Sequence, residues 1–306
     1  MNALLTTAFL VAVLRASGPI LMATMGSVIT ERAGTPNIGV EGMMLAGAFT
    51  SVTVTIEAGN PWVGAGGGAL AGVVLAVVMA FVVIDLRADA IVAGFAINLF
   101  VAGFTVLLLS EIYDSKGSVS RPDMSTLPTI RLPVTDVPVL GAAAAQNVMV
   151  WVAFAAIPIT WVVLFRSRFG LRMRAVGDDA PSALAAGVPV RRIQYQALGL
   201  GGALSGLAGA SLAIGYLSSF TRDMTAGRGF IALAAALFGG RHPGAAAAAA
   251  LLFGAAEAAG NRLQGEGVAS QFVLMLPYLV TAVALATISI RRTRARRRDL
   301  TTVVAR

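Results

Sequence analysis

Long apolar segments alternate with short polar ones along the whole of this chain. The apolar runs cover about 4–29, 41–56, 62–84, 90–110, 147–165, 195–217, 229–239, 245–259 and 271–290. A helix needs roughly 20 apolar residues to cross the hydrocarbon of a bilayer, so most runs are long enough, whereas 229–239 is short for a full crossing. A β-barrel has short alternating segments instead. The pattern predicts an all-α transmembrane helical bundle of about 8–9 spans, in a single domain over 1–306.

Backbone breakers interrupt this pattern at two places. The pair Gly18-Pro19 lies inside the first apolar run and is expected to kink or break that helix. Residues 31–45, ERAGTPNIGVEGMML, place glycines and a proline between two apolar runs. Backbone without hydrogen bonds is tolerated within a bilayer where protein buries it or it lines a cavity. We expect a broken or re-entrant element near 31–42, with Asn37 and Glu41 as its polar groups; the alternative is a surface loop in which Glu31 and Arg32 pair.

Other residues within the apolar runs allow two interpretations each. Asn98 lies in the middle of a run, where its amide either faces a substrate or bonds to a neighbouring helix. Glu257 is a functional candidate because acids within spans usually are, although Asn261 and Arg262 offer local partners. The stretch GGALSGLAGA at 201–210 repeats small residues at helical spacing. It predicts close helix packing, with a sliding helix contact as the alternative.

Composition supports a membrane protein and narrows its chemistry. The chain is 57% hydrophobic and 12% charged, whereas soluble domains carry about 25% charged residues. The formal charge of +8 could suggest nucleic acid, but the basic residues concentrate in 166–192 and 291–306, so no nucleic-acid partner is expected. With no cysteine and one histidine, His242, neither a cysteine-based nor a multi-histidine metal site is expected. The first apolar run lacks a basic leader and a cleavage site, so we expect it to be retained.

Charge in the polar segments predicts the orientation. Basic residues favour the cytoplasmic side, which places the loop at about 166–193 and the tail at 291–306 in the cytoplasm. The segment 111–146, with four prolines and more acids than bases, is expected outside as an ordered loop or cap. The arginines that we expect to anchor this topology are Arg166, Arg168, Arg172, Arg174, Arg191, Arg192, Arg291 and Arg292.

The loop at about 166–193 contains sequence features that a topology anchor alone does not require. Asp178 and Asp179 precede Ala180-Pro181, a combination typical of a helix start. A short helix over 181–186, closed by Gly187, is therefore expected. Such a capped helix in a loop suits docking of a soluble partner whose motion is transmitted to the spans.

Several motifs carry a family resemblance. The sequence LRMRAVGDDAPSALAAGVPVRRIQ, followed by ALSGLAGA, resembles the coupling segment of bacterial ABC-importer permeases, and most closely the nucleoside and simple-sugar branch of the branched-chain-amino-acid-like permeases. ERAGTPNIGVEGMMLAGAF, GRGFIALAAALFG, HPGA and MLPYLVT resemble the same branch, in the same order. The family more often has an apolar residue where Thr35 and Pro36 stand.

The resemblance implies a permease subunit that forms half of a path for a nucleoside or simple sugar in a bacterial cell membrane. It implies three partners: an ATP-binding cassette subunit, a second permease (a copy or a paralogue) and an extracytoplasmic substrate-binding lipoprotein. The residues expected at the ATPase contact are Asp178, Asp179, Pro181, Ala185 and Gly187, and those along the substrate path are Asn37, Glu41 and Asn98.

This chain is not expected to be an enzyme. It has no G-x-x-x-x-G-K-[ST] loop, and its one lysine, Lys116, lies in the segment expected outside. ATP and magnesium are therefore expected in the partner, with no cofactor bound here. The alternative function is a self-sufficient secondary transporter or channel for a small neutral solute, which should show related halves or a buried ion-coupling cluster.

Overall fold

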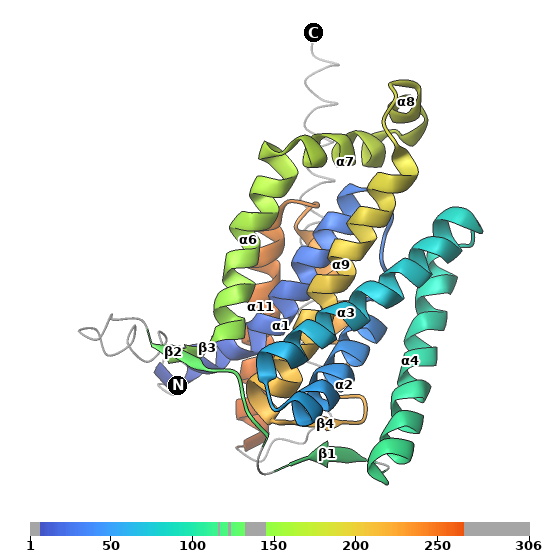
Figure 1. The fold of residues 1–306 in the computed structure, drawn as a ribbon. Helices are drawn as coiled ribbons and strands as arrows, with labels where there is room; N and C mark the ends of the chain where they lie inside the picture. The colour runs from blue at the N-terminus through green and yellow to red at the C-terminus, as the bar shows by residue number, and fades with distance from the viewer. Residues whose placement is uncertain (1–6, 116, 122–123, 132–144, 266–306) are drawn as a thin grey trace.

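A computed structural model describes residues 7–115, 117–121, 124–131 and 145–265. Long helices lie side by side in one bundle (Figure 1). They are α1 (Thr7–Arg32), α2 (Val40–Ala58), α3 (Pro61–Ala80), α4 (Ala90–Tyr113), α6 (Val148–Arg166), α9 (Val190–Leu212) and α11 (Pro243–Gly265). Two π-helical turns, η2 (Phe81–Asp85) and η3 (Ala213–Leu217), extend α3 and α9.

Six helices of the described ranges are long and apolar enough to cross a membrane: α1, α3 with η2, α4, α6, α9 with η3, and α11. Helix α10 (Arg228–Phe238) is apolar but has only 11 residues, as the short run at 229–239 predicted. The polytopic helical bundle is confirmed, whereas the expected number of 8–9 spans is not. The run at 271–290 and the tail with Arg291 and Arg292 lie outside the described residues.

A kink or a break was expected at Gly18-Pro19, and the break does not occur. Helix α1 continues through Pro19 to Arg32. Every residue from Ser17 to Glu31 is buried, so Pro19 itself is enclosed by neighbouring helices, whereas Arg15, whose carbonyl loses its helical donor, is exposed. Proline is tolerated within membrane helices under these conditions.

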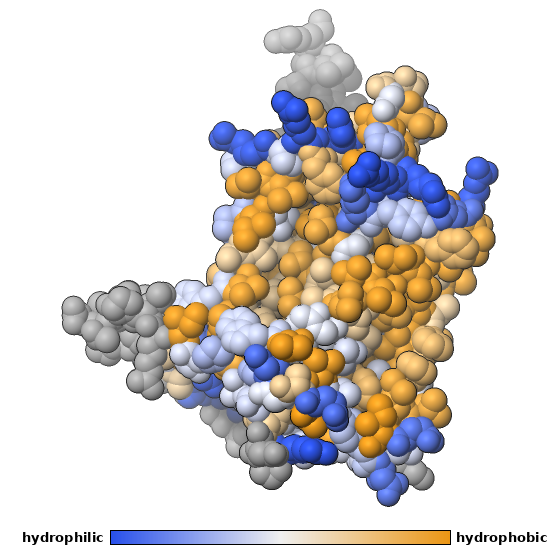
Figure 2. Space-filling model, in the orientation of Figure 1, coloured by the Kyte–Doolittle hydropathy of each residue, from blue (hydrophilic) through white to orange (hydrophobic). Residues whose placement is uncertain are grey.

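The two ends of the bundle differ in structure. At one end, α7 (Arg168–Asp178) and α8 (Ala180–Ala185) lie across the helix ends; at the other, β1 (Ser118–Ser120) pairs antiparallel with β4 (Ser219–Thr221), and β2 (Thr129–Arg131) with β3 (Ala145–Asn147) (Figure 1). An apolar belt separates the more polar ends (Figure 2). The loop expected in the cytoplasm and the segment expected outside thus lie at opposite ends. The described parts of the latter contribute strands where the sequence predicted only an ordered loop or cap.

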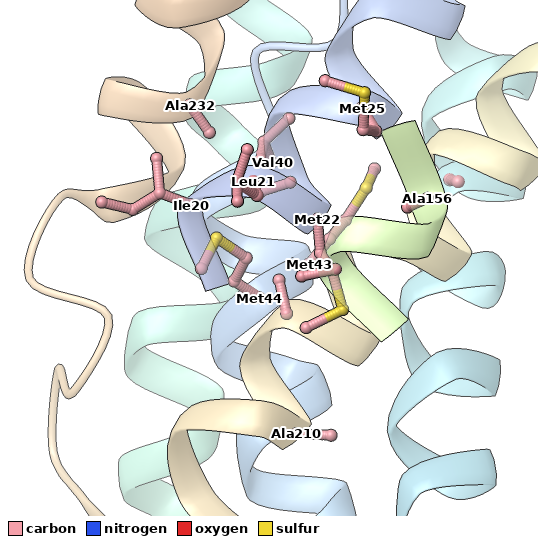
Figure 3. Close-up of a cluster of buried hydrophobic side chains, with 14 of the residues drawn as sticks. Ile20, Leu21, Met22, Met25, Val40, Met43, Met44, Ala156, Ala210 and Ala232 are labelled. Atoms are coloured by element: carbon pink, nitrogen blue, oxygen red, sulfur yellow. The ribbon is translucent and has the colours of Figure 1, made fainter. Parts of the chain in front are cut away.

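Methionine and small residues fill the centre of the bundle. Met22 of α1 and Met43 and Met44 of α2 are fully buried and lie close together (Figure 3). Ala156, Ala210 and Ala232 reach the same cluster from α6, α9 and α10. Unbranched methionine side chains fill irregular gaps, which suits a core that also contains many alanines.

Glycines bring α2, α3 and α9 into backbone contact. A Cβ atom placed on Gly47 would lie 2.6 Å from the Cα atom of Gly206, and one placed on Gly68 would lie 2.8 Å from the carbonyl oxygen of Gly47. Real Cβ atoms do not approach so closely, so these positions require glycine. The close packing predicted from 201–210 is confirmed.

Candidate functional site

A non-helical segment inside the protein separates α1 from α2, and we call it the first interruption. Residues 33–39 are not helical, yet Thr35 and Asn37 are 4% and 0% exposed and Glu41 is 9% exposed. An ordinary surface loop is therefore the wrong interpretation. The Glu31–Arg32 pair that went with this alternative is also wrong, because adjacent helical residues point in different directions. The Glu31 carboxylate instead lies 3.6 Å from Nε of Arg241.

Two asparagines satisfy the backbone of this interruption. The side-chain oxygen of Asn37 accepts a hydrogen bond from the Gly39 N–H at 3.0 Å. From α4, Asn98 accepts from the Gly42 N–H at 2.8 Å and donates to the Ile38 carbonyl at 2.9 Å. Asn98 thus pairs one of the free N–H groups at the start of α2, which a helix cannot satisfy itself.

A second interruption precedes α10. After β4 the chain turns through 222–227 without a helix and begins α10 at Arg228, with Gly227 (φ +82°) as the preceding residue. Helix α10 then leads to the turn at 239–242, where the Arg241 carbonyl accepts a hydrogen bond from Arg32 Nε at 2.7 Å. The chain therefore passes from the strand end to the α7 end, but only its second part is helical. Eleven helical residues rise about 16 Å, so α10 begins near mid-depth.

Glu41 joins the two interruptions. One carboxylate oxygen accepts from the Gly227 N–H at 2.8 Å and the other from the Gly229 N–H at 2.6 Å. A carboxylate is favoured there by the unpaired N–H groups and the positive end of the helix dipole. Gly229 permits the approach, because a Cβ atom on it would lie 2.6 Å from the Cα atom of Glu41. The starts of α2 and α10 thus meet near mid-depth.

Helix α10 is also tied to α11 by a charge pair that the sequence did not indicate. Arg228 forms an ion pair with Glu257 and donates to the Met224 carbonyl at 2.9 Å. Local pairing of Glu257 with Asn261 or Arg262 was one of its two predicted roles. The structure pairs Glu257 with Arg228, which lies 29 positions earlier. Arg228 directly precedes the apolar run at 229–239, and Glu257 lies within the next run. Two opposite charges at similar depth in adjacent helices are a signal that could have suggested this pair.

At the α7 end, α8 has the geometry that its sequence predicted. Asp179 precedes the helix and its carboxylate accepts from the Ser182 N–H at 3.4 Å and from the Ser182 hydroxyl. Pro181 lies in the first turn, Ala185 is the last helical residue, and Gly187 follows with φ +78°. Leu184 points an apolar side chain away from the bundle, 63% exposed.

The end of α7 contacts the first interruption directly. A Cβ atom on Gly34 (φ +71°) would lie 3.2 Å from the Cα atom of Gly177, and one on Gly177 would lie 3.0 Å from the Gly34 nitrogen. Asp178 and Asp179 follow at once and lead into α8. Helix α8, which protrudes from the bundle, is therefore linked through the end of α7 to the non-helical segment between α1 and α2.

The arginines expected as topology anchors of the 166–193 loop lie at the α7 end. Arg168, Arg172 and Arg192 are exposed, Arg166 lies over the Trp161 ring at 5.6 Å, and Arg174 lies over the Phe165 ring at 5.1 Å. Arg191 makes two hydrogen bonds to the Asp85 carboxylate, at 2.6 and 2.9 Å, and the Tyr195 hydroxyl donates to the same carboxylate. This pair ties the end of η2 to the start of α9.

An apolar helical bundle whose interrupted helices meet near mid-depth defines a membrane transport protein. Comparison with known proteins identifies which one: residues 9–286 match the family of permease components of the branched-chain amino acid transport system, and the chain belongs to that family. No solved structure matches it.

Relatives cover most of the chain. The guanosine ABC transporter permease NupQ of Bacillus subtilis is 34% identical over 88% of each chain. The nucleoside ABC transporter permease NupC of Lactococcus lactis is 33% identical over the same share of each. The putative glucose ABC transporter permease TsgC13 of Haloferax volcanii is 34% identical over 83% of this chain and 77% of its own. The protein is a multi-pass permease of the bacterial cell membrane.

Proposed function

We propose that this chain is the membrane subunit of an ATP-driven importer and forms half of the path for a nucleoside. The observation that carries the substrate class is the similarity over nearly the whole chain to permeases named for guanosine and nucleosides. A simple sugar is the second candidate, because a relative as similar in sequence as the guanosine permease is named as a putative glucose permease.

The meeting of two interrupted helices supports a path near Asn37, Glu41 and Asn98. Transporters use interrupted helices because their free backbone groups can meet the polar groups of a substrate. The polar atoms of all three residues are already bonded within the protein, mostly to backbone groups. Their proposed role is therefore to position the junction that the substrate passes, and contact with substrate requires the junction to open.

Helix α8 supports docking of the ATP-binding subunit. Leu184, Ala185 and Ala186 form an exposed apolar surface at the α7 end. Beside it lies a groove of about 520 Å³ between α8 and the start of α9, lined by Leu184, Pro189, Val190, Arg191, Arg192 and Tyr195. We assign ATP and magnesium to that partner; a second permease would complete the path, and a substrate-binding lipoprotein would deliver the nucleoside from outside.

Uptake by a deletion strain tests the substrate. We expect loss of tritiated guanosine uptake that this chain restores, with glucose uptake unchanged. If the chain restores glucose uptake but not guanosine uptake, the substrate is a simple sugar and not a nucleoside. Accumulation by the purified chain alone in sealed vesicles, without ATP, would favour the secondary transporter instead.

The Leu184→Asp variant tests the coupling contact. Leu184 is exposed, so a charge there should leave the bundle folded but disfavour an apolar partner surface. We expect normal amounts in the membrane, loss of the co-purified ATP-binding subunit and loss of uptake, whereas the control Leu184→Met keeps all three. Normal co-purification and uptake for Leu184→Asp would reject α8 as the docking helix.

A further inference from the structure

Arginines from three separate elements gather near one aromatic ring at the α7 end of the bundle. Arg32 ends α1, Arg174 lies on α7, and Arg241 lies in the turn between α10 and α11. The guanidinium carbons of Arg32 and Arg174 lie 5.8 and 5.1 Å from the centroid of the Phe165 ring of α6. The His242 ring lies 5.5 Å from the same ring. We call these residues the Phe165 cluster.

Positive charge in the Phe165 cluster is only partly compensated. Of the described ion pairs, the cluster contains one, between Arg241 and Glu31 at 3.6 Å. Arg32 is within electrostatic range of Arg174 and Arg241, with Asp178 as the opposing acid. In the part of the chain that the structure describes, neither Arg32 nor Arg174 has a carboxylate oxygen within 4.0 Å. Like charges held together in this way favour binding of an anion.

One donor of the cluster also lacks an acceptor. Nε of Arg174 is buried and has no hydrogen-bond partner. A buried donor without an acceptor is costly, and buried polar groups nearly always have partners. Planar guanidinium groups pair especially well with phosphate oxygens. An oxyanion placed between Arg174 and its neighbours would supply the missing acceptor and the missing charge.

The surroundings of the cluster indicate where that anion comes from. The outer face of α6 is apolar and exposed beside it, through Ile159, Trp161 and Val162, so acyl chains can lie along this helix. Trp161 stacks with Arg166 on the same helix, and such aromatic residues mark the headgroup level of a membrane. Basic pockets between membrane helices on the cytoplasmic side bind lipid headgroups. We propose that the Phe165 cluster binds the headgroup phosphate of an anionic phospholipid.

Lipid retention by the purified full chain tests this proposal. Delipidated protein is titrated with phosphatidylglycerol or phosphatidylcholine, and bound lipid is counted by native mass spectrometry. Each arginine near an anionic headgroup contributes enough to change affinity severalfold. We therefore expect native protein to favour phosphatidylglycerol, and R174Q/R241Q to bind it at least about tenfold more weakly. The matched control R168Q/R172Q loses the same charge from exposed sites on α7 and should stay within about twofold.

Unfolding temperature without lipid shows whether each variant is folded. Arg241 is exposed, so R241Q alone repeats the test, with a smaller expected effect, should the double variant not fold. Equal weakening in R174Q/R241Q and R168Q/R172Q would overturn the site, since it would reflect general charge. Binding of inorganic phosphate at the cluster without retention of phosphatidylglycerol would overturn a lipid as its occupant.

Discussion

Replacing Glu41 by glutamine isolates the contact that joins α2 to α10. The carboxylate accepts two backbone N–H groups, from Gly227 and Gly229, at 2.8 and 2.6 Å. Glutamine keeps the shape but offers one oxygen, so one buried N–H faces an amide nitrogen instead of an acceptor. The Glu57→Gln variant is the matched control, because Glu57 lies on the same helix and is exposed.

The expected loss follows from two terms. An unpaired buried N–H costs about 1–3 kcal/mol, and the charge at a partly buried helix start contributes up to about 2 kcal/mol. Together they predict a loss of about 1–5 kcal/mol in the free energy of unfolding, which is roughly 2–8 °C in unfolding temperature by the scaling for folded domains. Glu57→Gln should shift it by no more than about 1 °C, because exposed substitutions change stability little.

Thermal unfolding of the detergent-purified protein measures this loss, and guanosine uptake by cells measures its effect on transport. We expect Glu41→Gln to remain assembled at growth temperature and to transport more weakly than Glu57→Gln. Equal unfolding temperatures for the two variants would show that the Glu41 contact does not hold the junction. A destabilised Glu41→Gln variant with full uptake would instead show that the junction stabilises the fold without forming part of the substrate path.

Three further predictions concern packing, the α3–α9 contact and orientation. Gly68→Leu should abolish the folded peak in size-exclusion chromatography, because its Cβ would lie 2.8 Å from the Gly47 carbonyl oxygen, whereas Gly66→Leu, with no atom within 4 Å, should elute normally. Asp85→Arg and Arg191→Asp should each reduce uptake, whereas the double variant, which restores the ion pair with its charges exchanged, should restore uptake. If the double variant does not restore uptake, the ion pair is not the reason for the loss in the single variants. Cysteines at 120 and 135 should react with an impermeant reagent in intact cells, and those at 180 and 295 only after permeabilisation; positions 135 and 295 lie outside the described residues, and the reverse pattern would overturn the orientation.

Features encoded by neighbouring residues were predictable from the sequence. Helix α8 is specified within ten residues by its capping acid, a proline in the first turn and a glycine after the end, and its observed bounds, Ala180–Ala185, differ from the prediction by one residue. The apolar runs likewise predicted most long helices, since hydrocarbon thickness alone sets their length. The interruption at 33–39 was also visible, because glycine and proline disfavour a continuous helix.

Contacts between distant residues were not predictable in the same way. The sequence contains the acid Glu41 but not the fact that its acceptor oxygens meet Gly227 and Gly229, 186 and 188 positions away. The surface-loop alternative paired Glu31 with its neighbour Arg32, whereas the helix directs Glu31 to Arg241. In each case the partner is set by which helices lie side by side, and a single sequence with uniformly apolar spans carries little information on that arrangement.

The order of contacts gives the proposed coupling a mechanical basis. Helix α8 follows α7 directly, and Gly177 of α7 touches Gly34 by backbone. Gly34 belongs to the interruption at 33–39, which ends where α2 begins, and Glu41 lies in the first turn of α2. Backbone contacts between glycines transmit displacement without a side chain that could change rotamer to absorb it. The chain is non-helical at 33–39, before α2, and at 222–227, before α10, so either helix can change its angle without breaking an internal hydrogen-bond ladder. Movement of α8 by a partner is therefore expected to reach α10 through the junction before it disturbs the glycine-packed unit of α2, α3 and α9.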